Sequence, residues 1–402
     1  MKFLLSLLII VFLIGCGSDK SKEHFKVNDI VSPAGALSGE PFLYTDANGK
    51  VYLSWIEKLD SSHVFKYATL NGETWSEPTV ISEGKSWFVN WADYPMITTQ
   101  DGSQMLAHVL AKSGESTYAY DVKMFSSGDN GATWNQSFVL HDDNKQAEHG
   151  FVSMVPYGDN VFVTWLDGRN TVMEGMENME GHDGHHGAMS LRGAIIDYQG
   201  KKIDEWELDN KTCDCCQTTS AITDNGPIAV YRDRSDEEIR DMSIVRWING
   251  EWTKPKTIYA DNWKIAGCPV NGPRVSAIGN NVAVAWFGLV DNEAQVKVIF
   301  SNDGGDTFGN PVRIDEGKPI GRVDIEMIDK DRAIISWMEG TKIKAVTVSV
   351  DGTKGEPIEV GASSEARSSG FPQMAKKGND LIFAWTDDAA KTIKTALLKL
   401  EL

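Results

Sequence analysis

Residues 49–55 read Gly-Lys-Val-Tyr-Leu-Ser-Trp: a turn glycine, a short run of mostly apolar residues, and an aromatic side chain. Six further copies of this pattern follow at intervals of 48 to 66 residues. The seven copies end at Trp55, Val109, Trp165, Tyr231, Trp286, Trp337 and Trp385. This period fits the four-stranded blades of a β-propeller. The repeat therefore predicts an all-β fold, a single β-propeller of seven four-stranded blades.

The two ends of the repeat region predict how the ring closes. From Phe371 to Leu402 there is room for only three strands, whereas an extended segment at 24–31 precedes the first copy. Pairing this segment with the last blade would remove two exposed strand edges. We expect an N-terminal strand near residues 25–31 to complete the last blade, so that the propeller spans residues 25–402.

Two stretches between expected third and fourth strands share a second pattern. Residues 127–134 read SGDNGATW and residues 301–308 read SNDGGDTF. Both resemble the Asp-box, or BNR repeat, of sialidase-like β-propellers, in which the aspartate accepts hydrogen bonds within the turn and glycine allows a positive φ. The resemblance implies that Asp129 and Asp303 are structural. Sialidase propellers usually have six blades, so the seven predicted here depart from that family.

The resemblance to sialidases fails at the first catalytic position. Sialidases bind a substrate carboxylate with three arginines and use an aspartate acid with a tyrosine–glutamate pair. The first arginine normally precedes the first blade, where this chain reads GEPFLY at 39–44; its first arginine is Arg169. No sialidase active-site residue is transferred, and whether the chain is an enzyme stays open. A glycoside hydrolase that uses Asp93, Asp167 or Glu237 is an alternative.

The N-terminus predicts export and anchoring. Lys2 is followed by an apolar run that is too short to span a bilayer, which is typical of a secretory signal. The run ends in Leu-Ile-Gly-Cys, which resembles a bacterial lipobox and implies cleavage before Cys16 and a lipid on its thiol. We predict a signal peptide at 1–15, a lipidated cysteine and tether at 16–24, and a location in the bacterial cell envelope, most simply the outer membrane.

The formal net charge of −18 argues against nucleic acid, which requires basic surfaces. The expected partners are therefore the membrane, through the lipid anchor, and an envelope protein or a glycan; we expect a monomer.

Loop positions predict that unusual residues share one face. The loop from the fourth strand of one blade to the first strand of the next (4–1 loop) and the loop between strands two and three (2–3 loop) lie at one end of the ring, opposite the Asp-box turns. Ligands often bind where such loops converge. The alternating charges of this face also suit a salt-bridged loop. Apart from metal ligands, the candidate residues there are Trp91, Asp93, Asp167, Arg169, Arg232, Asp233, Arg234, Glu237, Arg240 and Asp241.

The 2–3 loop of blade three carries an insertion rich in sulfur and imidazole. Thioether and imidazole together favour Cu(I), because zinc seldom uses methionine and calcium prefers oxygen. His149 lies on the same predicted face. The alternative is a flexible acidic loop, since glutamates fill the gaps. The candidate ligands in the insertion are Met173, Met176, Met179, His182, His185 and His186.

The cysteines beyond Cys16 suit either a metal site or disulfides. Cys213, Cys215 and Cys216 form a C-x-C-C sequence, and Cys268 lies in the next 4–1 loop. An oxidising envelope favours two disulfides, but adjacent cysteines pair only under strain, so a thiolate metal site, or one disulfide with two free thiols, is easier to build. Three hypotheses follow: a copper-binding envelope lipoprotein in copper handling or redox chemistry, a glycoside hydrolase, and a non-catalytic binding platform with structural disulfides.

Overall fold

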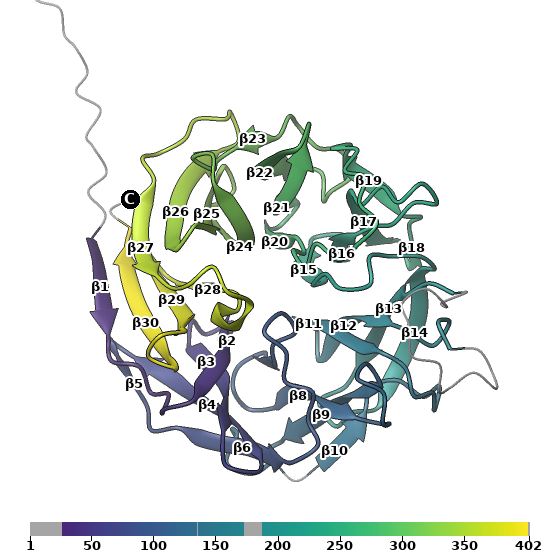
Figure 1. The fold of residues 1–402 in the computed structure, drawn as a ribbon, viewed down its shortest axis with the longest axis vertical. Helices are drawn as coiled ribbons and strands as arrows, with labels where there is room; N and C mark the ends of the chain where they lie inside the picture. Colours follow the sequence, from purple (N-terminus) through teal and green to yellow (C-terminus); the bar gives the residue numbers. More distant parts are fainter. Residues whose placement is uncertain (1–25, 135, 173–186, 401–402) are drawn as a thin grey trace, which may run out of the picture.

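The structure, a computed structural model, describes residues 26–134, 136–172 and 187–400 of the 402-residue chain. Its strands form seven antiparallel sheets arranged as blades around a central axis (Figure 1). The predicted seven-bladed all-β propeller is thereby confirmed. Within these ranges no helix is long and apolar enough to cross a membrane, and the helix found there is a short 3-10 turn at Arg367–Ser369.

The blades contain the following strands in chain order. Blade one has β2 (Ser38–Thr45), β3 (Val51–Lys58), β4 (His63–Asn71), β5 (Thr74–Trp75) and β6 (Thr79–Gly84); blade two has β7 (Ile97–Thr99), β8 (Met105–Lys112), β9 (Tyr120–Ser127) and β10 (Gln136–Val139). Blade three has β11 (His149–Tyr157), β12 (Asn160–Asp167), β13 (Ser190–Ile196) and β14 (Lys202–Asp209); blade four has β15 (Thr219–Thr223), β16 (Gly226–Arg232), β17 (Met242–Ile248), β18 (Glu251–Trp252) and β19 (Lys256–Tyr259). Blade five has β20 (Arg274–Ile278), β21 (Asn281–Val290), β22 (Glu293–Ser301) and β23 (Val312–Arg313); blade six has β24 (Pro319–Asp329), β25 (Arg332–Glu339), β26 (Lys342–Ser349) and β27 (Ile358–Ala362); blade seven has β28 (Gln373–Lys377), β29 (Asp380–Asp387), β30 (Thr392–Lys399) and β1 (Lys26–Ile30).

The seven repeated stretches of sequence are the second strands of the blades. Almost every residue of β3, β12, β16 and β25 is buried, because each blade packs against a neighbour on both of its faces. Burial on both faces explains why these strands read as apolar runs rather than as alternating patterns.

Buried tryptophans at the ends of the second strands carry a polar contact that repeats with the blades. An indole N–H buried without an acceptor is costly. In three blades it donates to a carboxylate two residues later: Trp55 to Glu57 (2.8 Å), Trp165 to Asp167 (2.8 Å) and Trp337 to Glu339 (2.7 Å). Asp167 therefore has a structural role in the blade.

The N-terminal strand closes the ring as predicted. Strand β1 pairs antiparallel with β30, from Lys26 opposite Lys399 to Ile30 opposite Thr395, and becomes the outer strand of blade seven. Purple β1 and yellow β30 lie side by side in Figure 1. The last blade thus joins the two ends of the described chain.

Both Asp-box turns have the hydrogen bonds that the resemblance implied. The Asp129 carboxylate accepts from Thr133 N (2.9 Å) and Thr133 Oγ1 (2.6 Å), and Asp303 accepts from Thr307 in the same way (2.8 and 2.6 Å). Trp134, which ends the first turn, packs edge-on against Tyr67 of blade one. The turns join third to fourth strands, so they lie at the opposite end of the ring from the 4–1 and 2–3 loops.

Candidate metal centre

The C-x-C-C sequence lies in the 4–1 loop between β14 and β15, and neighbouring blades hold this loop at both ends. Cys213 N donates to Arg232 O (3.1 Å) at the end of β16. Beyond the cysteines, Gln217 Nε2 donates to Ala92 O (2.6 Å), and Gln217 Oε1 accepts from Gly272 N (2.8 Å). Because these anchors come from the end of β16 and from two other 4–1 loops, the loop that carries the cysteines is held in place on both sides.

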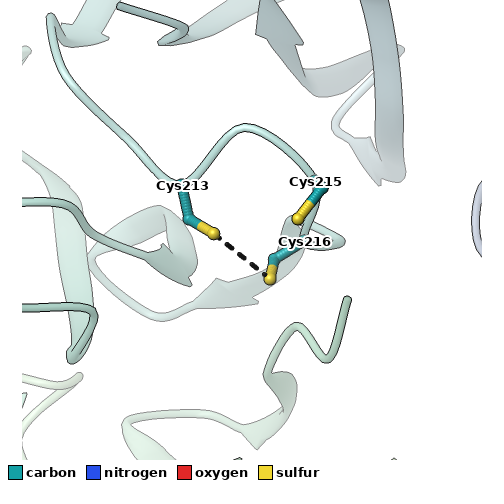
Figure 2. Close-up of side chains that lie close together, drawn as sticks. All are labelled: Cys213, Cys215 and Cys216. Carbon is teal, nitrogen blue, oxygen red and sulfur yellow. Dashed lines mark hydrogen bonds between the residues drawn. The ribbon is translucent and has the colours of Figure 1, made fainter. Parts of the chain in front are cut away.

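Three thiols of this loop converge (Figure 2). The Sγ atoms of Cys213, Cys215 and Cys216 lie within 4.8 Å of one another, and those of Cys213 and Cys216 are 3.5 Å apart. Cys213 and Cys216 are buried, whereas Cys215 is half-buried. Cys268, in the 4–1 loop between β19 and β20, is exposed and interacts with Cys215. All four are free thiols in the structure.

A buried guanidinium contacts the innermost thiol. Arg240 Nη1 donates to Cys213 Sγ across 3.2 Å, and Arg232 Nη1 donates to Arg240 O (2.7 Å). Hydrogen bonds from Cys215 and Cys216, aided by the charges of the two arginines, hold the pKa of Cys213 well below its ordinary value. Burial raises the pKa of the Cys216 thiol to about 12. Cys213 is therefore the thiol of this group that ionises first.

Ion pairs position Arg240 against the sulfur. Arg234 Nη1 donates to both carboxylate oxygens of Asp214 (3.2 and 3.0 Å), and Arg234 Nη2 pairs with Glu238 (2.9 Å). Glu238 also accepts from Arg240 Nη2 (2.6 Å). The charge-rich 2–3 loop of blade four is thus a salt-bridged loop that also presents a guanidinium to the cysteines.

The remaining charged candidates of that loop have other partners. Asp233 accepts from Ser243 Oγ (2.9 Å), and Asp241 accepts from Trp263 N (3.2 Å), which holds the next loop. Glu237 is exposed and contacts its neighbour Ser235. Nothing in these contacts brings Glu237 to the thiols.

Two further candidates lie in the 4–1 loop between blades one and two. The Trp91 ring stacks on Phe371 at 5.7 Å, and the Arg322 guanidinium lies 5.2 Å from its centroid. Asp93 is buried and accepts a hydrogen bond from Phe151 N (2.7 Å). Burial raises the pKa of Asp93 to about 7.

His149, which the sequence grouped with the cysteines, belongs to a different cluster. Its Nε2 lies 3.1 Å from Asp143 Oδ2, and its ring stacks on His141 with centroids 3.6 Å apart. Asp167 and Arg169 join this cluster through a bidentate pair with two distances of 2.8 Å. The reason is positional: His149 begins β11 and faces the seam between blades two and three, whereas the cysteines precede β15.

The predicted methionine and histidine ligands of the insertion, Met173 to His186, lie outside the described residues. Sequence reasoning missed His141, Asp143, Asp121 and the contact of Arg240 with sulfur. The first two had a signal, because residues 141–149 read HDDNKQAEH, a histidine- and aspartate-rich 4–1 loop. The Arg240 contact had none, since it depends on how two separate loops pack.

Fold and site define a seven-bladed β-propeller with two Asp-box turns and a convergent thiol cluster on the face that carries the 4–1 and 2–3 loops. No family model and no curated protein matches the sequence. Among solved structures, a puromycin-hydrolysing peptidase from Mycobacterium tuberculosis is similar, with a TM-score of 0.50 and 10% identity over 92% of this chain and 55% of that chain.

Two sialidases are similar at lower scores. The NanB sialidase of Streptococcus pneumoniae aligns over 94% of both chains with a TM-score of 0.46 and 10% identity. The phage phi92 endosialidase aligns over 94% of this chain and 70% of that chain, with a TM-score of 0.47 and 10% identity. At these identities the likeness extends to the fold alone.

Proposed function

We propose that the protein is a lipid-anchored protein of the bacterial cell envelope that binds Cu(I) through Cys213, Cys215 and Cys216, in copper handling or redox chemistry. One observation carries the proposal: three thiols converge within 4.8 Å, and a buried arginine contacts one of them. Thiolates are the ligands that soft ions such as Cu(I) prefer. The lipid on Cys16 and the envelope location rest on sequence and are part of the proposal.

Charge at the site favours a monovalent ion. Two or three thiolates around Cu(I) leave a net negative charge, and a buried anion requires positive charge close by. Arg232 and Arg240 are both buried and lie near enough to lower the pKa of Cys213. Within the described parts of the chain, Arg240 Nε is buried without a hydrogen-bond partner, so this guanidinium has spare capacity to interact with an anionic complex.

Cys268 fits the role of an outer ligand. It is exposed, and its interaction with Cys215 lowers its pKa. An exposed, readily ionised thiol can meet an incoming ion first and pass it to the buried sulfurs, since thiolate exchange needs access. Weaker binding by the methionines and histidines at 173–186 stays a prediction.

Anaerobic reconstitution of the full chain with Cu(I), with copper stoichiometry and a thiol count, tests the proposal. We expect one tightly bound copper per chain, which is lost when Cys215 and Cys216 are both replaced by serine. Cys268→Ser should weaken binding while the stoichiometry stays the same. Met327→Leu is the matched control, because it removes a buried sulfur in blade six with little change in volume.

Disulfide formation without copper binding is the outcome that would contradict the proposal. Two disulfides in protein isolated from the envelope, and no copper bound after reduction, would contradict the proposal. That result would favour a non-catalytic binding platform with structural disulfides.

A glycoside hydrolase is the second candidate, because two carboxyl groups at the end of the ring that carries the 4–1 and 2–3 loops can hold a proton near neutral pH. Burial raises the pKa of Asp93 to about 7 and that of Glu148 to about 7, as a general acid requires. Tyr120 donates to Glu148 (2.7 Å), but burial raises the pKa of Tyr120 well above its ordinary value, which does not suit a nucleophile. A glycan hydrolysis screen with Glu148→Gln, and Asp142→Asn as control, decides: no hydrolysis by the unmodified chain removes this candidate.

A further inference from the structure

A second cluster of metal-ligating side chains lies at the seam between blades two and three. The imidazoles of His141 and His149 stack with centroids 3.6 Å apart and planes within 8°. Asp121 of β9, Asp143 of the 4–1 loop before β11 and Asp167 at the end of β12 surround the two rings. Both histidine side chains are buried, with exposed fractions of 3% and 0%.

One side of this stack is saturated with hydrogen bonds. Asp143 bridges the rings, with Oδ1 2.7 Å from His141 Nδ1 and Oδ2 3.1 Å from His149 Nε2. Asp167 accepts from a buried indole, from the backbone N–H of Arg169 and twice from the Arg169 guanidinium. The carboxylate oxygens on this side already face donors, so a metal ion has no place there.

Three of the four ring nitrogens have partners. His149 Nδ1 lies 3.2 Å from the Tyr120 carbonyl oxygen, and its Nε2 lies 3.1 Å from Asp143 Oδ2, so both nitrogens of this ring are hydrogen-bonded. His141 Nδ1 is hydrogen-bonded to Asp143 Oδ1, which leaves Nε2 of His141 as the remaining ring nitrogen.

The other side of the stack is unsatisfied. Among the described residues, none forms a hydrogen bond with His141 Nε2, although this atom is buried. It faces Asp121 Oδ1 across 3.6 Å, which is too long for a hydrogen bond. A buried nitrogen without a hydrogen-bond partner costs free energy, and a cation held between Nε2 and the Asp121 carboxylate would interact favourably with both. The Asp121 side chain is 25% exposed, so the position is open to solvent.

We propose that His141 Nε2 and Asp121 bind a divalent cation of borderline softness, best matched by Zn²⁺, with water in the remaining coordination positions. Imidazole and carboxylate donors suit zinc, whereas Cu(I) prefers sulfur and Ca²⁺ prefers oxygen alone. Asp143 is a positioning residue, because its hydrogen bond to Nδ1 directs the Nε2 lone pair of His141 toward the ion, as in carboxylate–histidine–zinc sites.

The local charge is compatible with this ion. Three aspartates and the Arg169 guanidinium surround the two rings, so an added cation meets an environment rich in negative charge. The site shares no ligand with the thiol centre, and either proposal can fail without the other.

Zinc content of the purified full chain tests the site. Asp142→Asn is the control, because it changes an exposed carboxylate next to the cluster. The unmodified chain and this control should each bind one more Zn²⁺ per chain than Asp121→Asn or His141→Gln. Asp143→Asn should weaken that binding about 10- to 100-fold. Asp121→Asn alters a partly exposed side chain, so the test remains valid if the His141 variant fails to fold.

Cobalt substitution separates this site from the cysteines. The unmodified chain should bind one Co²⁺ that Asp121→Asn does not bind. The absorption of that ion should contain d–d bands without sulfur-to-cobalt charge transfer, since its ligands are nitrogen and oxygen. Equal zinc content in Asp121→Asn and the unmodified chain, or only sulfur-bound cobalt, would overturn the proposal.

Discussion

Asp93→Asn is expected to make the protein more stable at neutral pH and to flatten its dependence on pH. Asp93 is 6% exposed, and one of its carboxylate oxygens accepts from Phe151 N (2.7 Å). Asparagine retains an acceptor for that N–H and removes the charge. Burial raises the pKa of Asp93 from 3.8 to about 7, so the folded protein holds a proton at pH values where the unfolded chain has lost it.

The difference between the two pKa values sets the direction and the size of the effect of Asp93 on stability. Between the two pKa values the folded state binds more protons, so stability is highest in acid and falls as the pH rises toward 7. Each pH unit costs about 1.4 kcal/mol. The full rise costs roughly 4 kcal/mol, of which roughly 2 kcal/mol falls between pH 5 and pH 7.

Urea unfolding of both proteins at pH 5, 6, 7 and 8 measures the effect. Between pH 5 and pH 7, the decrease in the free energy of unfolding should be smaller for Asp93→Asn than for the unmodified protein, by roughly 2 kcal/mol. The control Asp142→Asn, which changes an exposed carboxylate, should show the same pH dependence of stability as the unmodified protein. Parallel curves for Asp93→Asn and the unmodified protein would show that this carboxyl ionises normally in the fold, and the reasoning from burial would be refuted.

Three further predictions concern the thiol centre, the turns and the ring. Arg240→Gln removes the donor to Cys213 and should move the pH profile of thiol alkylation to higher pH. An unchanged profile would show that Arg240 does not lower the pKa of Cys213. Asp303→Ala removes the acceptor for Ser301 and Thr307 and should lower the free energy of unfolding by about 1–2 kcal/mol with the fold retained, as urea unfolding and circular dichroism would show. Removing residues 26–30 exposes the edge of β30 and should cause self-association in size-exclusion chromatography; a monomer as stable as the full chain would argue against closure by β1.

The strands could be predicted from sequence because burial on both faces imposes a local pattern. The stretch ending at Trp165 has the same pattern as the one ending at Trp337, and each forms a second strand. Side-chain partners could not be predicted in this way. His141 and His149 stack because one 4–1 loop folds back on itself, and Asp121 reaches them from a strand that no repeat relates to that loop. The sequence placed Cys213 and Cys268 on one face, but the contact of Arg240 with sulfur required the packing of two loops.

The blades themselves explain why polar chemistry is concentrated at one end of this ring. The second strands are buried on both faces and leave little room for polar chemistry; in β12 the buried polar groups of Trp165 and Asp167 pair with each other. The Asp-box turns use their carboxylates internally, as Asp129 does with Thr133, which leaves little capacity for a ligand. The 4–1 and 2–3 loops are under neither constraint. They differ in length and composition from blade to blade, so changes there alter ligands without disturbing the sheets, and sulfur donors in one loop can coexist with imidazole and carboxylate donors in another.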